Sequence, residues 1–87
     1  AIYLSPYQDE PHLLLGRLYE RAGRLPDAMD EYKVALWCRE SVDAHLALGN
    51  ALVVFGDKPG ARVEAQRALA MQPGSAEART LLEKIDR

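Results

Sequence analysis

The chain contains HLLLGRLY at residues 12–19 and HLALGNAL at residues 45–52. Both stretches keep the same order of histidine, leucine and glycine. Internal repetition has to be recognised before single residues are interpreted, because a period of roughly 20 to 50 residues is the signature of repeat architectures. These two stretches therefore direct the interpretation of the whole chain.

The repetition extends far beyond these two stretches. Aligning residues 9–41 with residues 42–74 gives ten identical pairs in 33 positions: His12 and His45, Leu13 and Leu46, Leu15 and Leu48, Gly16 and Gly49, Gly23 and Gly56, Pro26 and Pro59, Ala28 and Ala61, Glu31 and Glu64, Ala35 and Ala68, Leu36 and Leu69. The sequence predicts the end of a preceding repeat at residues 1–8, repeat units at 9–41 and 42–74, and a capping helix at 75–87.

Composition and helix signals indicate that each unit consists of two helices. Ala and Leu together far outnumber Val, Ile and Thr, a balance that favours helices over strands. Asp9 and Ser41 are good N-cap residues, and Gly23 and Gly56 can end helices in the left-handed conformation. We therefore expect no strand anywhere in the chain.

Two prolines fix the start of the second helix in each unit. Pro26 and Pro59 suit a first helical turn, because the N–H that proline lacks is not needed there. Apolar residues recur at helical spacing on both sides of these turns. The predicted helices span residues 10–22, 26–38, 43–55, 59–71 and 76–86.

Two further glycines lie inside predicted helices. Gly16 and Gly49 each cost about 1 kcal/mol relative to alanine, so we expect close helix packing to offset that cost. Ala28 and Ala61 are small enough to form the other side of these contacts.

The motif that contains these glycines resembles the tetratricopeptide repeat (TPR) family over essentially the whole chain. The family pattern is Trp-x2-Leu-Gly-x2-Tyr, followed by Ala-x3-Phe and a proline. The corresponding residues are His12, Leu15, Gly16, Tyr19, Ala28 and Tyr32 in the first unit, and His45, Leu48, Gly49, Leu52, Ala61, Ala65 and Pro73 in the second. The departures are the two histidines, Ala65 in place of an aromatic residue, and Glu40 in place of a proline.

The resemblance implies an all-α, right-handed solenoid of antiparallel helix pairs. In the family, the first helix of each pair lines a concave groove that binds peptides. The implied groove residues are Leu14, Arg17, Arg21, Asn50, Val53, Val54, Leu81 and Lys84, beside Leu13, Glu20, Leu46, Ala47 and Thr80. We expect the basic residues to bind carboxylates and Asn50 to bind peptide backbone. Packing of the apolar members against their own neighbours, or against another domain, remains an open alternative.

One TPR subtype is disfavoured by its own motif. Domains that bind chaperone tails resemble one another in a clamp of Lys, Asn, Asn, Lys and Arg that holds two carboxylates. Those positions hold Leu13, Arg17, Ala47, Glu77 and Leu81 here. Because Glu77 would repel a terminal carboxylate, we do not expect a chaperone tail as the ligand.

The two ends of the array differ in polarity. Arg79, Glu83 and Asp86 occupy positions that would face a following helix, and a polar outer face is typical of a capping element. At the other end, Ile2 and Leu4 place apolar surface at an edge that looks cut from a longer array. We expect this edge to allow reversible self-association.

The charge and the residue types exclude several partners. The chain has 11 basic and 13 acidic side chains, so it lacks the excess positive charge that nucleic-acid binding needs. No apolar run approaches the roughly 20 residues of a membrane span, and we expect no membrane insertion. The single cysteine, Cys38, excludes an internal disulfide and leaves the compartment undecided, with the cytoplasm slightly favoured. Eight Arg against three Lys suggests a bacterial source.

Catalytic and metal chemistry find little support. His12 and His45 are possible metal ligands, but no further ligand completes either set, so we expect both to pack between helices without a metal. The sequence has no phosphate-binding glycine motif and no nucleophile beside a base, so we expect neither an enzyme nor a cofactor. Trp37 is expected to pack over the adjacent turn rather than to anchor a partner.

The sequence therefore favours a module that binds a protein or peptide through its concave groove. The alternative is a structural or self-assembly scaffold within a larger protein. An RNA-binding helical repeat ranks third, because the charge balance opposes it.

Overall fold

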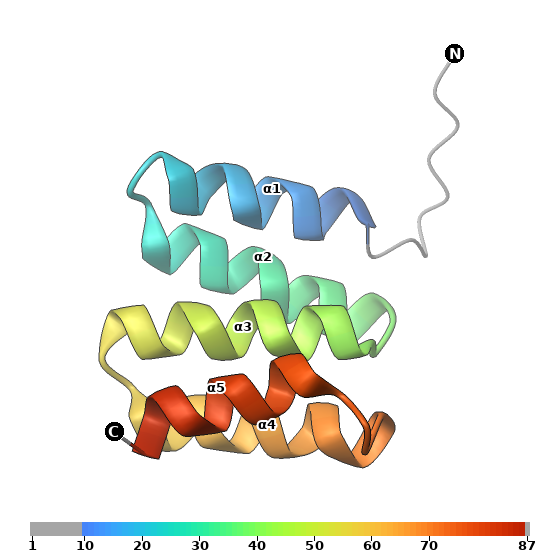
Figure 1. Ribbon diagram of the computed structural model, residues 1–87. Helices are drawn as coiled ribbons and strands as arrows, with labels where there is room; N and C mark the ends of the chain where they lie inside the picture. The colour runs from blue at the N-terminus through green and yellow to red at the C-terminus, as the bar shows by residue number, and fades with distance from the viewer. Residues whose placement is uncertain (1–9, 87) are drawn as a thin grey trace.

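The computed structural model describes residues 10–86, which form five α-helices (Figure 1). Their bounds are α1 Glu10–Arg21, α2 Leu25–Cys38, α3 Val42–Phe55, α4 Lys58–Met71 and α5 Ala76–Asp86. The predicted all-α class is confirmed, and each predicted helix boundary agrees to within one residue. The predictions for residues 1–8 and for the Asp9 cap lie outside the described residues.

Left-handed glycines end α1 and α3, as the sequence predicts. Gly23 and Gly56 have φ values of 80° and 102°. After α3, the N–H groups of Gly56 and Asp57 donate to the carbonyl oxygens of Val53 and Leu52. The same pair of hydrogen bonds follows α1, and in both places it satisfies carbonyls that a helix end leaves unpaired.

Side-chain caps and prolines begin the other helices. Ser41 Oγ accepts a hydrogen bond from the Ala44 N–H over 3.1 Å, and Ser75 Oγ accepts one from the Ala78 N–H over 3.2 Å. Pro26 and Pro59 lie in the first turns of α2 and α4. The start of each helix thus follows from a local signal.

The helices form two layers. Each helix contacts the next one along the chain, and α3 also contacts α1 and α5. Within residues 10–86, α2 and α4 do not contact each other. The first helix of each unit therefore lies in one layer with α5, and the second helices lie in the other (Figure 1).

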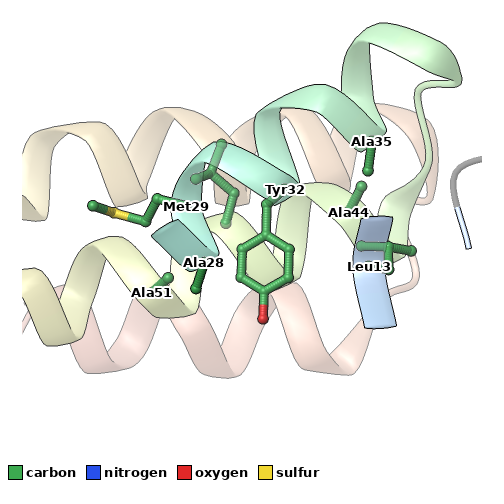
Figure 2. Close-up of a cluster of buried hydrophobic side chains, with 8 residues drawn as sticks. Leu13, Ala28, Met29, Tyr32, Ala35, Ala44 and Ala51 are labelled. Carbon is green, nitrogen blue, oxygen red and sulfur yellow. The ribbon is translucent and has the colours of Figure 1, made fainter. Parts of the chain in front are cut away.

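The core consists of two apolar clusters that correspond to the two units. The first joins α1, α2 and α3, and Figure 2 shows the ring of Tyr32 in its middle. The second joins α3, α4 and α5 around Ala61, Ala65 and Leu81. Alanines at the helix contacts, including Ala28 and Ala61, are completely buried.

Both helix glycines are buried, and a side chain fills the space beside each one. A Cβ added at Gly16 would lie 2.7 Å from Tyr32 Cδ1, and one added at Gly49 would lie 2.6 Å from Leu81 Cδ2. The Ala61 carbonyl oxygen is also near Gly49, at 3.6 Å from the added atom. At Gly16, the three nearest atoms belong to Tyr32 rather than to Ala28.

The two units therefore fill equivalent gaps from different elements. In the first unit, α2 supplies the large Tyr32 and α3 supplies the small Ala47. In the second unit the sizes are exchanged, since the equivalent positions hold Ala65 on α4 and Leu81 on α5. This exchange explains how Ala65 can replace the aromatic residue of the family motif, because Leu81 packs where the ring is missing.

Candidate binding groove

Two adjacent hollows lie on the layer formed by α1, α3 and α5. The first has a volume of about 250 Å³ and the second about 290 Å³, and Asn50 and Glu77 line both. We call this surface the groove; its lining residues are Arg17, Glu20, Tyr32, Asp43, Leu46, Ala47, Asn50, Ala76, Glu77, Thr80, Leu81 and Lys84.

The structure brings some of the predicted groove residues together and separates others. Arg17, Asn50 and Lys84 are exposed and line the hollows. The remaining exposed or half-buried members of the predicted set line neither hollow: Leu14, Arg21, Val53 and Val54.

Leu81 corrects the sequence-based interpretation. The resemblance placed it on the surface that contacts a peptide, but only 1% of it is exposed. Its side chain belongs to the second core cluster and packs beside Gly49. Leu81 therefore forms the buried floor of the second hollow. Leu13 is also buried, in the first core cluster, and lines neither hollow.

Acidic side chains are the feature that the sequence-based list of groove residues lacks. Asp43 and Glu20 line the first hollow, and Glu77 lines both. Asp43 and Glu77 occupy the first turns of α3 and α5. One repeat length separates them in the sequence, and this is the signal that could have placed them in one row.

Glu20 is held in place from α2. The hydroxyl of Tyr32 donates a hydrogen bond to Glu20 Oε1, which ties α2 to α1 at the edge of the groove. Burial of the ring, followed by the hydrogen bond to Glu20 and the negative charge of Glu20, raises the pKa of the Tyr32 phenol. Tyr32 is thus a neutral donor over the ordinary pH range.

Asn50 lies where the hollows meet. Its Nδ2 donates to the carbonyl oxygen of Leu46, one turn earlier, over 2.9 Å. This bond fixes the orientation of the side chain, while its Oδ1 makes no hydrogen bond to the described residues. Asn50 can therefore accept a hydrogen bond from the N–H group of a bound peptide.

The two repeat histidines contact glutamates rather than lining the groove. His45 Nδ1 donates to Glu64 Oε2 over 2.6 Å, and His12 Nδ1 lies 3.2 Å from Glu31 Oε2. Each contact joins the two helices of one unit. The sequence shows both residues repeated at the same spacing, but their pairing depends on the antiparallel packing of the helices.

The second pair is more deeply buried than the first. The side chains of His45 and Glu64 are 2% and 11% exposed, whereas those of His12 and Glu31 are 33% and 21% exposed. His45 Nε2 is buried 3.4 Å from Glu40 Oε2, and within residues 10–86 it makes no hydrogen bond. The described residues contain no group of three or more His, Cys, Asp or Glu side chains arranged to hold a metal ion.

Trp37 does not pack over the adjacent turn as the sequence suggested. It lies on α2 and is 89% exposed, so that prediction is wrong. Its equivalent in the second unit, Ala70, is also exposed. The position therefore faces solvent in both units.

Comparison with known proteins identifies no relative of this chain, because no family and no curated protein matches it. Of the helices within residues 10–86, none combines the length and the apolar character that crossing a membrane requires.

Proposed function

We propose that this chain is a TPR-type helical-repeat module that binds a peptide segment of a partner protein in the groove. The observation that carries the proposal is the continuity of the two hollows, which share Asn50 and Glu77 across α1, α3 and α5. A surface that continues across successive repeats suits a chain better than a compact metabolite. The module acts by binding, without catalysis or a cofactor, and its helix pairs stack as a right-handed solenoid.

The lining supplies the groups that peptide recognition needs. Arg17 and Lys84 offer charged donors, and Asn50 offers an oriented amide. Leu46 and Ala47 add apolar surface between them. Backbone hydrogen bonds combined with side-chain pockets are the usual means of recognising an extended segment.

Replacing Arg17 and Asn50 together by alanine should weaken peptide binding at least about tenfold. Both side chains are exposed, so the melting temperature should change little. Peptides are first selected from a random display library on the whole chain, and their affinities are then measured by fluorescence polarisation. The matched control is Gln66→Ala with Arg67→Ala, which removes the same groups from exposed positions on α4. Equal affinity of all three proteins would reject the groove.

Exposed leucines on α1 support a second candidate function, self-assembly. Leu15 and Leu18 are 40% and 50% exposed, whereas their equivalents in the second unit, Leu48 and Ala51, are 3% and 0% exposed. In the second unit, α2 covers that face of α3. Within residues 10–86, no helix covers the same face of α1. This face extends the self-association edge that was predicted from Ile2 and Leu4, which lie outside the described residues.

Self-association through α1 should give a concentration-dependent sedimentation coefficient. Replacing Leu15 and Leu18 by glutamine should abolish that dependence, because the contact is apolar. Glutamines at Val63 and Met71, which are exposed on α4, should leave it unchanged. A wild-type chain that sediments as a monomer at millimolar concentration would end this second candidate.

A further inference from the structure

The polar residues of the groove form two rows that cross the helices. Asp43 and Glu77 hold one register position in successive units. Arg17, Asn50 and Lys84 hold another, each one repeat length after the one before. Arranged in this way, the first row carries carboxylates and the second carries hydrogen-bond donors.

The distance between the rows follows from helix geometry. Asn50 comes two helical turns after Asp43 on α3, and Lys84 comes two turns after Glu77 on α5. At about 1.5 Å per residue, the rows lie about 10.5 Å apart along the helix axes. Residues at this spacing share one face of a helix, in agreement with their place in the linings of the two hollows.

The charged members of both rows have no partner within the described part of the chain. Asp43, Glu77, Arg17 and Lys84 form neither a salt bridge nor a side-chain hydrogen bond with residues 10–86. The carboxylate of Glu20, in contrast, accepts the Tyr32 hydroxyl. Four charges of the groove are therefore available to complementary groups of a ligand.

We propose that the groove binds an extended peptide segment of alternating charge, whose basic side chains contact Asp43 and Glu77 and whose acidic side chains contact Arg17 and Lys84. The inference rests on the proposed peptide-binding function and defines the class of peptide. Successive side chains of an extended segment point in opposite directions. A segment that lies between the rows thus presents its odd residues to one row and its even residues to the other.

The size of the hollows also favours an extended ligand over a helical one. A helix with its side chains is about 10–12 Å across, which leaves no room for side chains to extend from it toward rows about 10.5 Å apart. The hollows of about 250 and 290 Å³ suit single side chains. In the extended arrangement, Asn50 Oδ1 lies between the rows and can accept a backbone N–H of the ligand.

The test uses a display library of nonapeptides, selected on the whole chain at low salt. We expect the selected peptides to alternate Lys or Arg with Asp or Glu over at least four positions. A synthetic alternating Lys-Glu octapeptide should bind at least tenfold more tightly than an isomer with four lysines followed by four glutamates. Both complexes should weaken as salt rises, because the contacts are ionic.

Isosteric variants locate the contacts. Asp43→Asn with Glu77→Gln should reduce the affinity for the alternating octapeptide at least tenfold. The control is Asp30→Asn with Glu83→Gln, which removes two negative charges from exposed residues outside the groove lining and should retain the affinity. Circular dichroism melts establish that both variants remain folded.

The outcomes separate this inference from the function on which it rests. Selected peptides that depend on Arg17 and Asn50, but show no alternation or ignore the loss of Asp43 and Glu77, would overturn the charge pattern and leave the peptide groove standing. Selected peptides that depend on neither row would overturn both proposals. Equal binding of the two octapeptides would also reject alternation.

Discussion

Replacing Tyr32 by alanine should lower the free energy of unfolding by about 3–5 kcal/mol, the usual cost of deleting a buried aromatic side chain. Tyr32 is 1% exposed and lies at the centre of the first core cluster (Figure 2). Its ring fills the space beside Gly16, so its loss leaves a cavity where three helices meet. This loss is a large fraction of the stability of a small domain.

The second unit suggests how the cavity can be filled. There, Ala65 is compensated by Leu81, whose equivalent position in the first unit is held by Ala47. Adding Ala47→Leu to Tyr32→Ala should therefore restore about 1–2 kcal/mol, by burying a leucine side chain in the vacated space. In the wild-type background the same leucine should be neutral or destabilising, because the Tyr32 ring already fills that space.

Urea unfolding of the four proteins in this cycle provides the measurement. A coupling energy of at least about 1 kcal/mol between positions 32 and 47 would show that the two units exchange large and small residues. An identical effect of Ala47→Leu in both backgrounds would contradict the exchange. If Tyr32→Ala does not fold, Tyr32→Leu takes its place in the cycle.

Tyr32→Phe separates the hydroxyl from the ring. The variant should lose about 1 kcal/mol near neutral pH, because it loses the hydrogen bond to Glu20. Since the folded state raises the pKa of the phenol, the stabilisation is fully present below the ordinary pKa of 10.0 and is lost as the pH rises above it. Wild type should therefore lose stability between pH 10 and 12 more steeply than Tyr32→Phe.

The helices were predictable because their signals are local. Gly23 and Gly56 end helices through their own backbone conformation, and Pro26 and Pro59 start them through their missing N–H groups. Such signals depend on neighbours in the sequence, and their recurrence in the second unit reinforces each one. The boundaries therefore agree to within one residue.

The groove was harder to predict because its residues meet only through packing. Arg17, Asn50 and Lys84 follow from the repeat register, which is why the sequence identifies them. Asp43 and Glu77 have ordinary roles as first-turn carboxylates beside a helix dipole, and that local role conceals their shared position in the groove. The burial of Leu81 depends on Ala65, a residue of another helix, so no pattern within α5 reveals it.

Replacing Glu64 by leucine should cost about 2–3 kcal/mol, because it removes the acceptor of a buried imidazole. His45 is 1% exposed, and its Nδ1 donates to Glu64 over 2.6 Å. A buried donor left without its acceptor retains its full desolvation cost. Leucine keeps most of the volume of the glutamate stem, so the loss reflects the polar contact more than a cavity.

The first unit provides a matched control for this substitution. Glu31→Leu breaks the equivalent contact with His12, where both side chains are partly exposed. Water can replace the lost partner there, so the cost should be below about 1 kcal/mol. Equal losses for Glu31→Leu and Glu64→Leu in urea unfolding would show that burial does not govern the strength of the pair.

A double substitution distinguishes the value of the pair from the cost of breaking it. His45→Leu with Glu64→Leu removes both polar groups, so neither is left buried without a partner. Apolar replacements of a buried pair are often close to neutral, and the double variant should regain most of the stability that Glu64→Leu loses. A double variant as unstable as the single one would instead show that the imidazole ring is itself required for packing between α3 and α4. The recurrence of histidine and glutamate in both units would then reflect shape as well as hydrogen bonding.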